Sequence, residues 1–87
     1  MRTVYKQVLQ IEDKQVIEVP VGAKLLHVGL QNSQACIWYE CETENMCESR
    51  TIYCFGTGHK MPELDLNYIG TVIMLNGALV FHFYEKV

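Results

Sequence analysis

The sequence lacks the features that define several classes of protein. Its seven Lys and Arg residues are scattered among ten Asp and Glu, which gives a net charge of −3. Proteins that hold nucleic acid by its phosphates need clustered basic residues, so direct nucleic-acid binding is not expected. No window approaches the ~18 consecutive apolar residues of a membrane-spanning helix, so a membrane partner is not expected either. Lys6 and Gln7 stand where a signal peptide needs its apolar segment, which predicts a cytoplasmic protein.

Helical periodicity is missing as well. Nowhere does an apolar stripe with the spacing i, i+3, i+4, i+7 last for three turns, so no long helix is expected. Short runs of Val, Ile, Tyr and Leu between turn residues instead predict strands at 2–11, 15–19, 24–30, 35–41 and 50–55. With a C-terminal hairpin, these six or seven short strands predict an all-β antiparallel sandwich or small barrel. The chain is long enough for one domain, residues 1–87.

The segment from Tyr68 to Val87 reads as that hairpin. Asn76-Gly77 separates two apolar runs, and this dipeptide tolerates the positive φ angles of a two-residue type I′ turn. Leu75 then faces Ala78. The pairing continues outward through Met74–Leu79, Ile73–Val80, Val72–Phe81 and Thr71–His82.

Strand alternation divides the side chains of this hairpin between two faces. The first face carries Ile69, Thr71, Ile73, Leu75, Ala78, Val80, His82 and Tyr84. The second carries Tyr68, Gly70, Val72, Met74, Leu79, Phe81, Phe83 and Glu85. Because both faces are mostly apolar, both are expected to be covered, by the rest of the chain or by a second copy in a homodimer or larger assembly. The bulkier second face is expected to form the core, and the first face to be the surface for a second subunit or a partner.

Four cysteines, Cys36, Cys41, Cys47 and Cys54, are the first candidates for chemistry. Their spacing, C-x4-C-x5-C-x6-C, has no C-x2-C pair, and Cys36 and Cys41 fall on opposite faces of one predicted strand. Ligands arranged in this way do not converge on a zinc ion. Reduced thiols in the core or in loops are therefore expected, with a metal site or disulfides as alternatives. No metal site or cofactor is predicted.

Gly56, Thr57, Gly58 and His59 form a second candidate group. Their backbone N–H groups could bind an anion such as a phosphate group, and His59 could help to position it. However, a phosphate loop is followed by a helix, and no helix is expected here. The other interpretation is that the glycines allow a left-handed turn at a strand end. His82 and Tyr84 join this group, although a histidine among apolar neighbours is usually a neutral one that bonds a hydroxyl, here Thr71. Because no Ser or Cys stands in a recognisable nucleophile context, no catalytic residue and no enzyme is predicted.

Acidic residues form the last group. If the strand before them extended past Cys41, Glu40, Glu42 and Glu44 would project as a carboxylate row with a spacing of about 7 Å, close to that of phosphates along a nucleic-acid strand. Such a row could occupy the basic channel of a nucleic-acid-binding protein. The alternative is an exposed loop, predicted at 42–49, that keeps an edge soluble. Trp38, on the preceding strand, is added to the candidate partner-binding residues.

Four segments together resemble a family of short, phage-encoded, β-rich proteins of unknown function. They are Ile17 to Leu26, Cys36-Ile37-Trp38, Phe55 to His59 (Phe-Gly-Thr-Gly-His) and Gly77 to His82 (Gly-Ala-Leu-Val-Phe-His). The last two are the most specific, and together the segments span nearly the whole chain. The sequence departs from the family pattern in the 42–49 segment and in Cys41, Cys47 and Cys54. The resemblance implies a bacteriophage origin and one β-rich domain, and it supplies no catalytic residues.

The leading functional hypothesis is a non-catalytic viral binding protein. It would contact a host protein in the cytoplasm of the infected bacterium as a homo-oligomer, for example as an inhibitor of a CRISPR-type immune effector that itself binds nucleic acid. The alternative is a small-ligand sponge that holds a nucleotide-like anion with Gly56 to His59 and His82 in a pocket between subunits. A small hydrolase or metal protein is the third hypothesis.

Overall fold

The computed structural model describes residues 1–87 and consists of two antiparallel β-sheets. This confirms the all-β prediction. The chain forms seven strands and one short 3₁₀ turn: β1 (Arg2–Val8), β2 (Lys14–Pro20), β3 (Lys24–Gln31), β4 (Gln34–Glu42), β5 (Cys47–Gly56), β6 (Leu66–Met74), η1 (Leu75–Gly77) and β7 (Leu79–Lys86). No helix long enough to cross a membrane is present.

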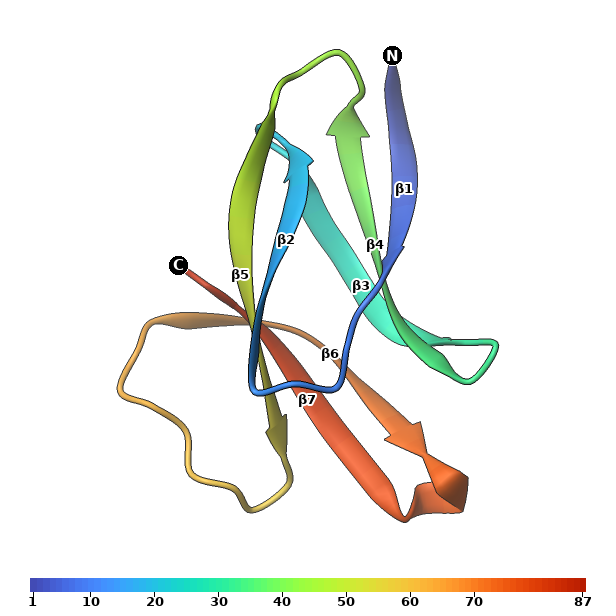
Figure 1. Ribbon diagram of the computed structural model, residues 1–87, viewed down its shortest axis with the longest axis vertical. Coiled ribbons are helices and arrows are strands. Elements are labelled where there is room, and N and C mark those ends of the chain that lie inside the picture. Colours follow the sequence, from blue (N-terminus) through green and yellow to red (C-terminus); the bar gives the residue numbers. More distant parts are fainter.

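The two sheets differ in size. The smaller has the strand order β1-β4-β3 and the larger the order β2-β5-β7-β6. Hairpins join β3 to β4 and β6 to β7, whereas β1 and β2 follow each other in the chain but belong to different sheets (Figure 1). The β3–β4 hairpin turns at Asn32 and Ser33, both with positive φ, at the predicted polar loop.

Two predicted boundaries are wrong. Strand β5 begins at Cys47, so the exposed loop expected at 42–49 shrinks to residues 43–46. The first residues of β5 are polar or charged, yet they pair with β2 as far as Pro20 opposite Cys47. Pairing of strands depends on backbone hydrogen bonds and does not require apolar side chains. The first strand ends at Val8, three residues earlier than expected.

The register of the hairpin follows the prediction. All four predicted pairs from Met74–Leu79 to Thr71–His82 are present. The N–H of Ala78 donates to the carbonyl oxygen of Leu75 at 3.0 Å, which closes the turn around Asn76-Gly77. Asn76 and Gly77 both have positive φ, but so does Leu75, and Ala78 is in the right-handed helical region. The loop therefore spans residues 75–78 and is not the two-residue type I′ turn that was predicted.

The predicted alternation is wrong at Tyr68 and Ile69. The ladder passes from Tyr68–Tyr84 directly to Gly70–Phe83, so Ile69 is an extra residue in a β-bulge. The bulge turns Tyr68 to the face of Tyr84 and Ile69 towards the core, against which it packs. Counted outward from the hairpin turn, a bulge moves every side chain beyond it to the opposite face of the sheet. No residue in the sequence indicates a bulge at this position.

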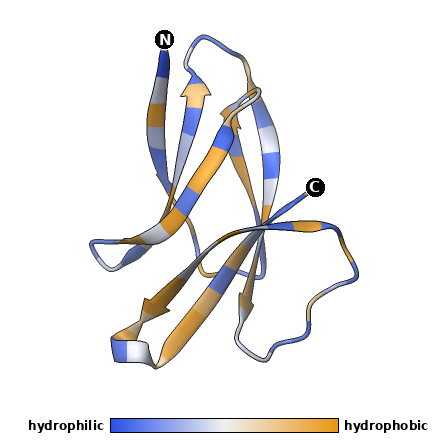
Figure 2. Ribbon diagram, turned by 180° about the vertical axis from the view of Figure 1, so that it is seen from behind, coloured by the Kyte–Doolittle hydropathy of each residue, from blue (hydrophilic) through white to orange (hydrophobic).

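The core lies between the sheets. It is built from the inward-facing residues of all strands except β1, with Leu9 added from the β1–β2 connection; its largest fully buried members are Phe83, Ile37, Ile52, Val19, Val28 and Val72. Phe83 and Val72 belong to the bulkier hairpin face, so the prediction that this face forms the core is confirmed. Figure 2 shows the β6–β7 hairpin as hydrophobic along nearly all its length, including the part that extends beyond the other sheet.

Candidate binding surface

The outer face of the larger sheet carries a row of aromatic rings. Tyr53 and Phe55 lie two residues apart on β5, with ring planes 8° from parallel and centroids 6.1 Å apart. Phe55 meets Tyr84 edge-on at 5.8 Å, and Tyr84 meets Tyr68 edge-on at 5.4 Å. The row therefore crosses from β5 through β7 to β6. Lys14 on β2 extends it, with its ammonium 5.9 Å from the Tyr53 ring centroid.

His82 lies at the centre of this face and has both ring nitrogens engaged. Its Nε2 is hydrogen-bonded to the hydroxyl of Thr57 at 2.7 Å, and its Nδ1 to that of Thr71 at 3.0 Å. The Tyr68 hydroxyl bonds Thr71 at 2.5 Å, which extends the chain to four side chains. The predicted Thr71–His82 pair is present, and His82 lies on the hairpin face opposite the core, as the alternation predicts.

The chemistry open to this network is restricted. A threonine hydroxyl beside an imidazole has the layout of a nucleophile and its base. However, the group that orients His82 is the Thr71 hydroxyl, where such enzymes usually place a carboxylate to stabilise the imidazolium. A hydroxyl both donates and accepts, so the network fixes the position of the ring without supplying that negative charge.

The segment from Gly56 to His59 is a tight turn at the end of β5. The N–H of His59 donates to the carbonyl oxygen of Gly56 at 3.1 Å, and Gly58 takes a φ of +86°. The His59 ring lies over Gly56, where an added Cβ would come within 2.9 Å of its Cε1 atom. The geometry therefore matches the left-handed turn that was one of the two interpretations of this segment.

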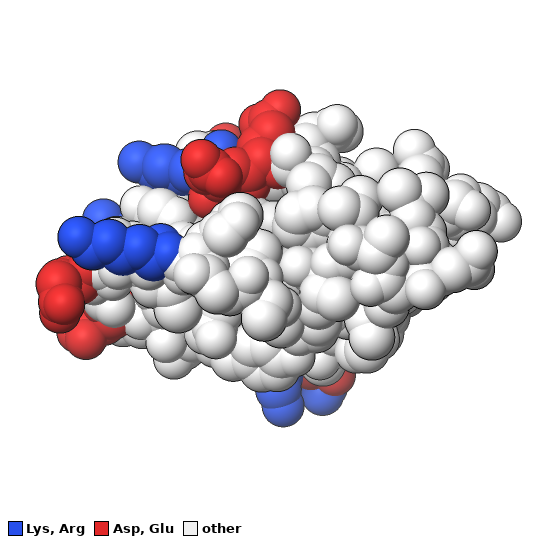
Figure 3. Space-filling model, turned by 90° about the horizontal axis from the view of Figure 1, so that it is seen from below, with Lys and Arg blue, Asp and Glu red and all other residues white.

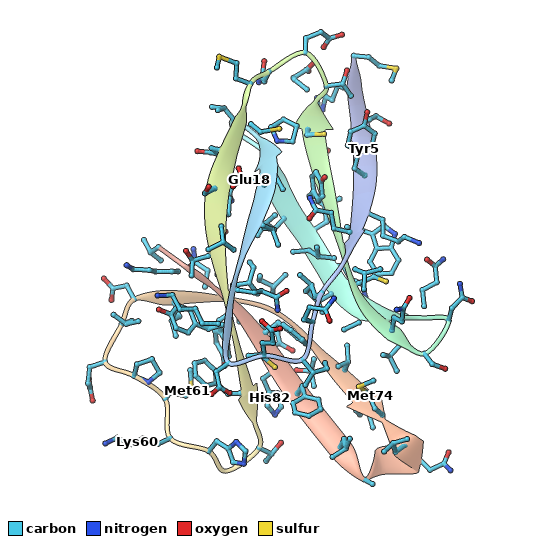
Figure 4. All side chains as sticks on the ribbon, in the orientation of Figure 1. Tyr5, Glu18, Lys60, Met61, Met74 and His82 are labelled. Atoms are coloured by element: carbon cyan, nitrogen blue, oxygen red, sulfur yellow. The ribbon has the colours of Figure 1, made fainter.

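His59 and His82 line the same groove. It has a volume of about 210 Å³, and its walls include Phe55, Thr57, His59, Met61, His82 and Tyr84. Figure 4 shows Met61 in the loop before β6 and His82 on β7. A neighbouring hollow of about 290 Å³ shares Phe55 and His59 and adds Lys14 and Lys60. The predicted group Gly56 to His59, His82 and Tyr84 is thus brought together in space.

Of the remaining candidate residues, Trp38, Glu40 and Glu42 lie on β4, on the outer face of the smaller sheet, whereas Glu44 lies in the turn after the strand. The predicted row of three carboxylates along one strand therefore does not form. Trp38 is on β4, and its ring lies 5.9 Å from that of His27, centroid to centroid. Glu40 forms an ion pair with Arg2 at 2.9 Å. The Met1 amino group bonds Glu44 and thereby lowers the pKa of that carboxyl. Glu42 lies 3.8 Å from the same amino group, so each of the three carboxylates lies near a positive group at the start of the chain.

The four cysteines do not gather. Cys41 and Cys54 lie in the core, Cys36 is buried on the other side of β4, and Cys47 is exposed; all four are free thiols. Burial raises the pKa of the Cys54 thiol to about 11, with a smaller contribution from Asp13. No three His, Cys, Asp or Glu side chains are placed to hold a metal ion.

The sequence did not single out Tyr53, Phe55 and Tyr68 as site residues. The alternation of Tyr53 and Phe55 against Ile52 and Cys54 was visible in the sequence, but not which of the two sets faced outward. Simple alternation assigns Tyr68 to the inner face, because it does not include the bulge at Ile69. Tertiary pairing therefore assembled the aromatic row from residues that had looked unrelated.

Fold and surface together define an all-β protein of two antiparallel sheets with an aromatic outer face. The family model described as a domain of unknown function, DUF7352, matches residues 1–87, so the chain belongs to that family. No curated protein and no solved structure matches the chain.

Proposed function

We propose that this protein is a non-catalytic binding protein that contacts a partner protein through the outer face of its larger sheet and works as a homo-oligomer. The observation that carries the proposal is the aromatic row from Tyr53 to Tyr68, of which Tyr68 is 59% exposed. Tyrosine and other aromatic side chains contribute large contact areas at protein interfaces and are enriched among their energetic hot spots.

Several features favour a protein over a nucleic acid as the partner. Aromatic rings on a sheet can also stack on bases, but such surfaces also carry a positively charged path for the backbone. Here the segment from Leu66 to Tyr84, which supplies half of the larger sheet, contains no charged residue, and the net charge is −3. Rings with hydroxyl groups at their edges match the mixed apolar and polar character of a protein surface.

The proposal of a non-catalytic role draws on the His82 network. Both ring nitrogens bond threonine hydroxyls, and neither bonds a carboxylate. The network is explained as a brace that fixes the position of the ring in the aromatic face.

A finer version of the proposal places the protein in a bacteriophage. There it would inhibit a host immune effector, such as one of the CRISPR type, in the cytoplasm of the infected cell. This version is supported by the sequence resemblance around Phe55 to His59 and Gly77 to His82. The carboxylate row offers it less support, because Glu40 and Glu44 already pair with positive groups of this chain.

A matched pair of variants tests the binding face. Tyr68→Glu places a charge on the aromatic face, whereas Val4→Glu does the same on the outer face of the smaller sheet, where Val4 is 51% exposed. Tagged wild type and Val4→Glu should retain the same protein from a bacterial lysate, and Tyr68→Glu should lose it, because the loss of a hot spot costs about 2 kcal/mol or more. Equal capture by both variants would remove the aromatic face from the proposal.

The groove between His59 and His82 favours a second candidate, the small-ligand sponge. It lies beside the hollow lined by Lys14, Lys60 and one carboxylate, Asp13. Neither lysine forms an ion pair within the chain, so an anion could bind between them next to aromatic walls. AMP, GMP, CMP and UMP, with inorganic phosphate as the control anion, should then raise the melting temperature of the wild type. His59→Ala should abolish the shift and Glu40→Ala should preserve it; no shift with any nucleotide would exclude this candidate for these ligands.

A further inference from the structure

The end of the β6–β7 hairpin, residues 73–80, is apolar on both faces; we refer to it as the hairpin tip. Ile73 is 60% exposed on the outer face, and Leu79 is 40% exposed on the inner one. Leu75, in the turn itself, is 71% exposed. The smaller sheet covers the inner face of the hairpin near Gly70, where Val28 touches it, and the tip extends beyond that cover (Figure 1).

The conformation of Leu75 is unusual. Its φ is +50°, in the left-handed region, where a side chain with a Cβ is disfavoured by roughly 1–2 kcal/mol. Asparagine and glycine, which follow it, enter this region far more easily. An exposed turn position in this conformation would ordinarily carry a polar residue. A strained and exposed leucine is therefore a local cost in free energy that burial of its side chain in an interface would offset.

Charge is absent from the whole region. All seventeen Lys, Arg, Asp and Glu residues lie outside the segment from Leu66 to Tyr84. Viewed from the hairpin end, the coloured charged residues lie towards one side, and a broad uncharged area covers the other (Figure 3). A charged partner surface would lose hydration here without gaining an ion pair. The tip therefore fits another uncharged, apolar surface.

A second copy of this chain provides such a surface. A membrane does not fit as well, because an anionic lipid surface attracts basic residues and the tip has none. In a two-fold symmetric contact the same patch serves on both sides, so the tip needs no complementary site elsewhere. Contact through the tips also keeps the net charges of −3 of the two copies at opposite ends of the assembly.

We propose that two copies of the chain dimerise tip to tip, with Ile73, Leu75 and Leu79 of each copy buried in the contact. This inference deepens the self-association included in the proposed function and rests on it. The aromatic row lies on the same sheet but away from the tip, because three ladder pairs separate the Tyr68–Tyr84 pair from the Ile73–Val80 pair. The dimer would therefore leave two partner-binding faces free.

Sedimentation equilibrium tests this surface with three variants. Wild type should have twice the 10.0 kDa mass of one chain at micromolar concentration. Ile73→Glu and Leu75→Asn should weaken dimerisation by about tenfold or more, and Val4→Glu, a matched exposed change on the other sheet, should leave it unchanged. Leu75→Asn is the sharper variant, because asparagine suits the left-handed backbone. We therefore expect it to raise the melting temperature of the monomer while it weakens the dimer.

Two outcomes would overturn the inference: wild type that stays a 10.0 kDa monomer at about 100 µM, or Ile73→Glu and Leu75→Asn proteins that dimerise like wild type. Circular dichroism confirms that each variant is folded. Capture of the partner by the aromatic face is a separate measurement. A monomer that still captures the partner contradicts only the tip dimer, whereas a dimer that captures nothing contradicts only the proposed partner binding.

Discussion

Gly70 on β6 lies directly against the backbone of Val28 on β3. A Cβ atom added at Gly70 would come within 2.7 Å of the Val28 carbonyl oxygen and 3.0 Å of its nitrogen. This is the point at which a strand of the smaller sheet meets the edge of the larger one and closes one side of the core. The register counted from the hairpin turn places Gly70 on the inner face with Val72, and the bulge begins only at the next residue outward, Ile69.

We predict that Gly70→Ala destabilises the fold by about 2–3 kcal/mol, because neither backbone can move away without separating the sheets. Gly56→Ala is the matched control. Its Cβ would meet the His59 ring at 2.9 Å, but that side chain can rotate away, so the loss should be below about 1 kcal/mol. Urea unfolding measures both. Equal losses would mean that the β3–β6 contact is not rigid.

A second prediction concerns the ion pair of Arg50 and Glu85. Two guanidinium nitrogens of Arg50 donate to the Glu85 carboxylate, and a third donates to the carbonyl oxygen of Ala23 at 2.9 Å. The hydrogen bonds to Glu85, with a smaller contribution from Glu48, raise the pKa of Arg50. Arg50→Met should cost about 2–3 kcal/mol, because it leaves a half-buried carboxylate without its partner.

The double variant Arg50→Met with Glu85→Leu separates this cause from lost packing. It should recover part of the stability, because the half-buried Glu85 carboxylate is removed together with its partner, and the carboxylate that remains near Arg50, Glu48 at 3.5 Å, is more exposed to water. Chemical unfolding of the two single variants and the double variant gives the coupling energy. A double variant whose loss equals the sum of the single losses would contradict the pairing.

A third prediction follows from the raised pKa of Cys54. Between pH 9 and 11 the thiol ionises in the unfolded chain, whose ordinary pKa is 9.0, while in the folded protein it stays protonated. The folded state then binds more protons, so this contribution to stability is complete below about pH 9 and is lost as the pH rises to about 11. The loss attributable to this thiol is at most about 2–3 kcal/mol.

Tyrosines and lysines titrate in the same pH range, so the effect of Cys54 is measured by comparing the unfolding free energies of variants and wild type at several pH values. Cys54→Ala should show a shallower fall than wild type between pH 9 and 11. Ile52→Val truncates a neighbouring core side chain without removing a titrating group, so its curve should run parallel to that of wild type. Parallel curves for all three proteins would rule out the thiol as the cause.

The His82 network gives a fourth prediction. Thr71→Val removes the hydroxyl that bonds both His82 and Tyr68, and should cost about 1–2 kcal/mol. Tyr68→Phe removes one bond at the exposed end of the chain and should cost less than about 1 kcal/mol. Thermal unfolding gives the order of the two losses, and nitrogen NMR of His82 reports whether its ring keeps one tautomer. A larger loss for Tyr68→Phe would contradict the network as described.

Several parts of the fold could be predicted from local sequence. The Asn76-Gly77 turn fixed the register from Met74–Leu79 to Thr71–His82, because turn chemistry acts over a few residues. The larger side chains of the hairpin correctly identified the core face, of which Phe83 is fully buried. The candidate site could be predicted only in part: Gly56 to His59 and His82 do line one groove, whereas Trp38 and Glu40 lie on the opposite sheet.

By itself, the sequence determined the elements whose causes are local: seven short strands, the hairpin turns and the alternation of inward and outward side chains. The tertiary structure alone decided which strands became neighbours, because every residue except proline has the same backbone donor and acceptor, so these groups do not specify a partner strand. It paired β5 with β7 and so placed Phe55 beside His82 and Tyr84. It also placed a bulge at Ile69, which brought Tyr68 onto the aromatic face, and it packed β3 against β6, which placed Gly70 against Val28.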